Sequence, residues 1–226
     1  MTLEEFQRKF SEIRELGFVE TKRRGPTGIG HTLEQLLGLT ENNIALPDFG
    51  DIELKAHRSS SPSLITLFTF NRKAWIMNPE AAVRKYGTPD STGRLGLYFT
   101  MSLTPNAAGV FLRIEEGELQ VRHIDGTLIA KWGLINITER FMRKIPALIF
   151  VTASSEERNG SEYFWYSRAQ LLEGSSPAIL REQFAVHGVV LDLRLHDHQT
   201  RARNHGTGFR VYESNLPRLF AQVRDL

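Results

Sequence analysis

Hydrophobic residues near the N-terminus recur at helical spacing. A capping-box pair, Thr2 and Glu5, precedes them, and Gly17 follows them. The pattern therefore predicts a first helix that ends before Gly17. Its buried face is expected to carry Phe6, Phe10, Ile13 and Leu16.

Strand patterns dominate the rest of the chain. A second, short helix is expected first, with its N-cap at His31 or Thr32 and its end near Gly38. Helical segments are also expected near 79–85 and 138–145. Without a repeat period or a linker longer than a loop, the mixture predicts an α/β or α+β protein with a mixed sheet; of the two we expect α/β, with helices flanking the sheet. The expected strands lie near 51–56, 64–70, 95–103, 110–114, 119–124, 128–132, 147–152, 163–166, 189–198 and 209–212.

Composition narrows the class of protein. The 226 residues are 41% hydrophobic and 24% charged, which is typical of a globular protein and excludes disorder. The absence of cysteine excludes thiolate metal sites, disulfides and cysteine nucleophiles, so any metal must bind oxygen or imidazole. No signal peptide or apolar run of about 18 residues is present, so we expect a cytoplasmic protein without a membrane partner.

Positive charge gathers in two stretches, although the net charge is only +2. Residues 55–85 contain six Lys or Arg and one acidic residue. Residues 194–210 contain four Arg and three His against one Asp. Such stretches favour a polyanionic partner.

The glycine-rich run Gly25–Thr32 resembles a phosphate-binding P-loop. It departs from that motif because His31 stands in place of the lysine and no buried strand precedes it. Two interpretations remain open. The run is a tight turn, or its backbone amides together with Lys22, Arg23 and Thr27 grip a nucleic-acid phosphate.

Candidate catalytic chemistry lies between Asp48 and Lys55. Strand alternation places Asp51, Glu53 and Lys55 on one face, and a bulge or short hairpin could bring Asp48 beside Glu53. Two carboxylates that hold Mg²⁺ and a lysine that orients water are what phosphodiester hydrolysis requires. The alternative is an edge strand with a charged face.

A second polar strand face lies near the C-terminus. Leu191, Leu193 and Leu195 alternate there with Asp192 and Arg194, so one face is buried and the other is polar. Asp and Arg two residues apart could read a C·G pair or form a surface ion pair.

Two further patterns have less favoured functional interpretations. His196 and His198 could ligate a metal, but no third ligand is evident. The aromatic run 163–166 could stack on bases, but packing is the expected role.

The N-terminal motifs resemble those of the MvaI/BcnI restriction endonucleases, relatives of the nickase MutH within the PD-(D/E)xK nuclease superfamily. The matching residues are GPTGIGHTLE (25–34), LGL (37–39), ENN (41–43), PD (47–48) and IELK (52–55). The resemblance implies that Asp48, Glu53 and Lys55 form the catalytic core, with one or two Mg²⁺ ions on Asp48 and Glu53. It also implies a catalytic role for Glu34 on the short helix.

The C-terminal segment also resembles that family. The resemblance implies base contacts from Asp192, Arg194, His205 and Arg210. Arg203 stands where one branch of the family has a His-x-His pattern, and it is a further candidate for DNA binding. His57 and Arg58, directly after the catalytic motif, complete the expected DNA-binding set.

The sequence thus predicts a type II restriction endonuclease that cleaves double-stranded DNA with Mg²⁺. The resemblance implies a GC-rich pseudopalindromic site of the type CC-N-GG, a 5′-phosphate product, and a monomer that cuts one strand per event. A methyltransferase would be a genetic rather than a physical partner. The alternatives are a MutH-like repair nickase and a DNA-binding protein that does not cleave.

The resemblance also implies two lobes, one with the PD-(D/E)xK core and a second that recognises DNA. The catalytic lobe would comprise 1–90 and about 145–185, and the recognition lobe about 91–144 and 186–226.

Overall fold

The computed structural model describes residues 1–39, 47–59, 61–70, 74–198, 202–204 and 206–226. The chain folds into two compact units. The first unit comprises Met1–Ser63, Arg143–Ser175 and Phe220–Leu226, and the second comprises Leu64–Met142 and Ser176–Leu219.

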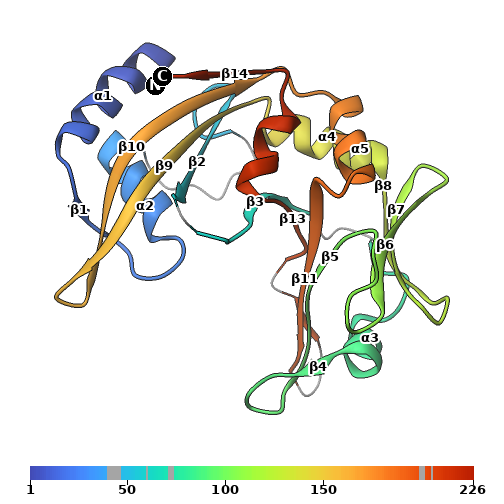
Figure 1. The fold of residues 1–226 in the computed structure, drawn as a ribbon. Coiled ribbons are helices and arrows are strands. Elements are labelled where there is room, and N and C mark those ends of the chain that lie inside the picture. Colours follow the sequence, from blue (N-terminus) through green and yellow to red (C-terminus); the bar gives the residue numbers. More distant parts are fainter. Residues whose placement is uncertain (40–46, 60, 71–73, 199–201, 205) are drawn as a thin grey trace. The chain divides into compact units, whose positions relative to one another are not determined.

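The first unit is built on a five-stranded mixed sheet. Its strand order is β1-β10-β9-β2, and β14 pairs with β10 (Figure 1). β2 runs parallel to β9, and the other pairs are antiparallel. The strands are β1 (Val19–Glu20), β2 (Ile52–Arg58), β9 (Ala147–Arg158), β10 (Ser161–Glu173) and β14 (Gln222–Asp225).

Helices α1 (Leu3–Glu15) and α2 (Gly28–Leu37) share a hydrophobic core with this sheet. The core includes Phe6, Leu33, Leu54 and Phe164, all nearly inaccessible to solvent. α1 has the predicted capping box, since Thr2 N donates to Glu5 and Glu5 N donates to Thr2. The buried face of α1 matches the helical spacing in the sequence at three of its four expected positions; Leu16 is exposed.

The second unit contains two antiparallel sheets. The larger has the order β3-β13-β11-β5-β4, with β12 paired to β11, and the smaller has the order β6-β7-β8. Its helices are α3 (Pro79–Tyr86), α4 (Leu134–Lys144, whose last two residues belong to the first unit), α5 (Pro177–Ala185) and the 3₁₀ helix η1 (Glu213–Leu219). The strands are β3 (Ile65–Thr69), β4 (Thr88–Pro89), β5 (Leu95–Met101), β6 (Val110–Glu115), β7 (Glu118–His123), β8 (Leu128–Gly133), β11 (Val189–Asp197), β12 (Ala202–Asn204) and β13 (Gly208–Val211).

The predicted class, a mixed α/β protein, is confirmed, but the strands form three sheets instead of one. The predicted strands are all present, although β9 and β10 are much longer than expected. α5 was not predicted, and neither were the short strands β1, β4, β12 and β14. Among the described residues, no helix combines the length and hydrophobicity that a membrane span requires.

The compact units do not follow the expected lobe boundaries. Residues 64–90 belong to the second unit because β3 pairs with β13 there. Residues 220–226 belong to the first unit because β14 pairs with β10. Residues 176–185, which include α5 and its N-cap Ser176, belong to the second unit.

Candidate active site

The two faces of β2 differ in chemistry, as strand alternation predicts. Ile52, Leu54 and Ala56 pack into or against the hydrophobic core of the first unit. Glu53 and Lys55 lie on the opposite face, and Lys55 Nζ is 3.0 Å from Glu53 Oε1. Asp51 was expected on that face too, but it precedes the strand and is exposed.

A tight hairpin turn brings Asp48 back to β2. Phe49 and Ile52 exchange backbone hydrogen bonds of 3.1 and 3.0 Å around Gly50 and Asp51. Gly50 has φ +56, a conformation in which glycine is favoured. Asp48 Oδ2 then accepts a 2.8 Å hydrogen bond from Leu54 N, so its carboxylate lies beside the residue that follows Glu53. The predicted short hairpin is present.

Glu53 is a buried carboxylate held between two ammonium groups. Glu53 is 3% exposed. Its Oε2 lies 2.7 Å from Lys144 Nζ, and its Oε1 lies 3.0 Å from Lys55 Nζ. Burial raises the pKa of Glu53, and the nearby Asp48 raises it further, whereas Lys55 and Lys144 lower it. A buried acid with a shifted pKa beside a second acid is typical of a functional site.

The sequence patterns did not identify Lys144. It is the last residue of α4, and β9 begins three residues later at Ala147. Ala147 pairs with Ile52 at the start of β2, so the helix end lies beside this strand. Only this parallel pairing, which local sequence does not reveal, places Lys144 against Glu53.

The glycine-rich run forms a tight turn that leads into α2. A Cβ at Gly28 would lie 2.3 Å from the carbonyl oxygen of Arg23, so a larger residue at this position would clash with the backbone of the turn. The predicted N-cap at His31 or Thr32 is wrong, since α2 begins at Gly28 with Thr27 as its N-cap. Thr32 is instead buried inside the helix, where its hydroxyl accepts a hydrogen bond from Lys22 N.

Candidate residues on and after this turn are exposed to different degrees. Lys22 and Thr27 are exposed, whereas Arg23 is partly exposed. Glu34 lies in α2 with a partly exposed side chain. Its catalytic role stays a prediction, as do the DNA contacts expected of the turn. Only the two-residue strand β1 precedes the turn, which does not favour a nucleotide-binding P-loop.

Arg58 is bound within the first unit. Its guanidinium group donates to both carboxylate oxygens of Glu162, at 2.6 and 2.8 Å, and lies over the ring of Phe164. It also donates to the carbonyl oxygens of Gly25 and Pro26. Arg58 thus connects the glycine turn to β2 and β10, and a DNA contact would have to compete with these bonds.

His57 lies on the same face of β2 as Lys55 and is 7% exposed. Its Nε2 is 3.0 Å from both the carbonyl oxygen and the hydroxyl of Ser63.

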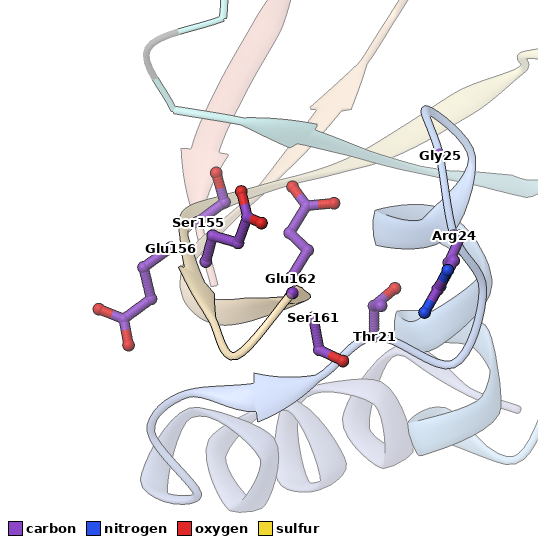
Figure 2. A pocket seen from close by; sticks show the side chains of 9 residues that line it. Thr21, Arg24, Gly25, Ser155, Glu156, Ser161 and Glu162 are labelled. Atoms are coloured by element: carbon purple, nitrogen blue, oxygen red, sulfur yellow. The ribbon is translucent and has the colours of Figure 1, made fainter.

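A polar hollow of about 400 Å³ lies between the glycine turn and the β9–β10 hairpin (Figure 2). Arg24 lines it, together with Glu156, Glu157 and Glu162. Glu162 is paired with Arg58 and Glu156 with Arg158, and Glu157 shares the lining with Arg24, so the hollow has no excess of positive charge to attract a phosphate.

A second set of candidate residues lies on the larger sheet of the second unit. Asp192 accepts hydrogen bonds from Thr100 Oγ1 at 2.6 Å and from Arg210 Nη1 at 2.5 Å. Arg210 also donates to the carbonyl oxygen of Leu64. The structure therefore pairs Asp192 with Arg210 and not with Arg194, two residues away.

The other candidates on this sheet are less constrained. Arg194 forms no hydrogen bond or ion pair with any described residue, and Arg203 on β12 is exposed. His205 lies outside the described residues. His196 and His198 lie with ring centroids 6.3 Å apart, but the described residues contain no group of three His, Asp or Glu side chains that could hold a metal ion.

Comparisons with known proteins identify the relatives of this chain. The model of the MvaI/BcnI restriction endonuclease family matches residues 7–220. The solved complex of restriction endonuclease MvaI with cognate DNA is 26% identical, with a TM-score of 0.81 over 100% of this chain and 99% of that chain. MvaI in the absence of DNA is also 26% identical, with a TM-score of 0.56 over 100% of this chain and 98% of that chain. No curated protein sequence matches the chain.

Proposed function

Because the chain belongs to the MvaI/BcnI restriction endonuclease family, whose members are deoxyribonucleases, we propose that it is a type II enzyme that hydrolyses double-stranded DNA at a specific sequence. One observation carries the proposal. The hairpin turn brings the Asp48 carboxylate to β2, where it is close enough to Glu53 to raise the pKa of that residue. The ammonium group of Lys55 lies 3.0 Å from Glu53 Oε1. This arrangement is the one that the PD-(D/E)xK motif implies.

The two carboxylates fit a magnesium ion. Leu54 N donates a hydrogen bond to Asp48 Oδ2. No described residue donates one to Asp48 Oδ1, so this oxygen can bind a metal ion. A divalent cation between Asp48 and Glu53 would also offset the burial and mutual repulsion that raise the pKa of Glu53. Mg²⁺ commonly binds through one or two carboxylates, and waters and phosphate oxygens fill its other positions. When bound, Mg²⁺ would polarise the phosphate and activate water for attack.

The protein's own residues would position the reactants. Lys55 shares a face of β2 with Glu53, so its ammonium group can donate to the attacking water or to a phosphate oxygen. Lys144 neutralises Glu53 Oε2 and favours the ionised carboxylate. Attack by water forms one P–O bond and breaks the bond to the 3′ oxygen, which leaves a 5′-phosphate and a 3′-hydroxyl.

The finer features of the activity follow from family membership. We propose a GC-rich pseudopalindromic site of the type CC-N-GG and cleavage of one strand per event by a monomer, with the first unit catalytic and the second unit reading the bases. Arg194 and Arg203 are suited to that reading because neither guanidinium group is bonded to a described residue. The protein would act in the cytoplasm.

Digestion of plasmid DNA tests this proposal. The purified protein with Mg²⁺ should yield discrete fragments, and sequencing of their ends should give one short GC-rich site with 5′-phosphate termini. EDTA should abolish the cleavage. An absence of cleavage would contradict the proposal, and nicking only after a second protein is added would favour a repair nickase.

A further inference from the structure

The larger sheet of the second unit has one polar face, here called the reading face. On β11 it carries Asp192, Arg194 and His196, while Leu191, Leu193 and Leu195 are buried on the other side. β5 pairs antiparallel with β11, so directly opposed residues share a face. Thr100 lies opposite Asp192, Tyr98 opposite Arg194, and Gly96 opposite His196.

Tyr98 lies flat on the reading face. A Cβ at Gly96 would be 2.6 Å from Cδ2 and 2.7 Å from Cε2 of the Tyr98 ring, so the ring occupies the space above that glycine. The Tyr98 hydroxyl is 2.7 Å from His196 Nδ1, and the two rings are nearly parallel, 17° apart. The tyrosine is therefore fixed by the glycine beneath it and by the histidine across the strand pair.

The fixed ring remains open to solvent. Tyr98 is 49% exposed, whereas His196 is 4% exposed and Asp192 is 7% exposed. The hydrogen bonds of Asp192 with Thr100 and Arg210 engage both of its oxygens. On β5 and β11, the Tyr98 ring and the opposed Arg194 therefore offer polar groups that DNA can reach, whereas Asp192 and His196 are buried.

We propose that Tyr98 is a further specificity-determining residue, whose hydroxyl contacts a base edge at or beside the base pair that Arg194 reads. A hydroxyl has one donor and two acceptor positions, so the bond to His196 leaves capacity for a base. Neighbouring strands lie about 4.8 Å apart, and base pairs are stacked about 3.4 Å apart. Opposed side chains therefore reach the same or adjacent base pairs. Gly96 and His196 are positioning residues, because they act through Tyr98.

This inference rests on the proposed sequence-specific function, and a binding experiment separates the two. A random duplex library is incubated with the protein in EDTA, and the bound DNA is isolated by gel shift and sequenced. Tyr98→Phe keeps the ring and removes only the hydroxyl. Tyr86→Phe is the matched control, because it removes a hydroxyl that is bonded to Asp125 on a side chain only 6% exposed.

Tyr98→Phe should relax the base preference at one position of the selected site by roughly three- to tenfold and leave the other positions unchanged. His196→Ala should relax the same position, and the double variant should add little, because both changes act on one contact. Tyr86→Phe should select the wild-type site. Thermal melts of each variant report whether folding is intact.

Unchanged base preferences with Tyr98→Phe would overturn the inference, and so would an equal loss at all positions. A wild-type protein that selects no sequence would overturn it too, since no specificity would exist to determine. Cleavage in Mg²⁺ is measured separately. Sequence selection without cleavage would refute the nuclease proposal and leave the Tyr98 inference standing.

Discussion

Glu53 is surrounded by groups with opposite effects on its charge. Burial and Asp48 disfavour the carboxylate, while Lys55 and Lys144 favour it. Burying a charged group costs free energy, and carboxyl groups with shifted pKa values cluster at functional sites. The individual contacts of Asp48 and Lys144 therefore lead to separable predictions.

We expect Asp48→Asn to abolish cleavage while DNA binding persists. The amide oxygen can still accept the hydrogen bond from Leu54 N, but the charge that would hold Mg²⁺ is gone. Cleavage should fall by several orders of magnitude in single-turnover assays, and affinity in gel shifts should change little. Glu53→Gln should behave alike. Near-normal cleavage by either variant would contradict the assignment of the metal ligands.

We expect Lys144→Met to make stability depend more steeply on pH. The pKa of Glu53 is raised above its usual value of 4.5, so its contribution to stability is present below pH 4.5 and is lost as pH rises through the folded-state pKa. Removing Lys144 raises the folded-state pKa of Glu53 further, so stability is lost over a wider range of pH. In EDTA, Lys144→Met should therefore lose more thermal stability than the wild type as the pH rises above 4.5.

Lys144→Arg is the matched control, because it retains a positive charge near Glu53 Oε2. Its pH dependence should follow that of the wild type. Parallel curves for Lys144→Met and the wild type would show that the ion pair with Glu53 does not influence the carboxylate.

At the scale of elements, the glycine turn and α2 are held in place by contacts with β2. Leu33 of α2 packs in the same hydrophobic core as Leu54 of β2, and Arg58 at the end of β2 donates to the carbonyl oxygens of Gly25 and Pro26. The position of Glu34 on α2 is thus fixed by a turn whose geometry depends on glycine.

Two glycines in this segment give a matched pair of variants. At Gly28 a methyl group would lie 2.3 Å from backbone, so Gly28→Ala should destabilise the protein by about 2 kcal/mol or more. At Gly30 the nearest atom is Glu34 Oε1 at 4.0 Å, so Gly30→Ala in the helix should be neutral or stabilising by up to about 1 kcal/mol. Urea denaturation of both variants measures this. Equal stabilities would mean that the turn can close without glycine.

The elements also show what local sequence can predict. Strand alternation correctly separated Glu53 and Lys55 from Leu54, because side-chain direction in a strand depends only on neighbouring positions. The start of α2 was missed because Thr32 is a good capping residue by type, yet here it bonds from inside the helix to Lys22. Lys144 and the pairing of Asp192 with Arg210 depend on contacts between distant segments, which spacing along the chain does not encode.

At the scale of the whole molecule, the chain crosses between the two units several times. The first unit takes segments from the start, middle and end of the sequence. The boundaries of the compact units follow strand pairing, as in β3 with β13 and β14 with β10. A tertiary contact thus decides the membership of each segment.

Each chain contains one Asp48–Glu53 pair and one reading face, and this sets the expected order of cleavage. A single catalytic centre can attack one phosphodiester at a time, so a monomer should cut the second strand only after a separate event. On supercoiled plasmid, we expect nicked circles to accumulate before linear DNA, with the rate of each step proportional to enzyme concentration. Sedimentation of the protein with its DNA duplex should give a complex that contains one protein chain. Direct conversion to linear DNA, with a rate that rises as the square of enzyme concentration, would indicate a dimer and contradict this expectation.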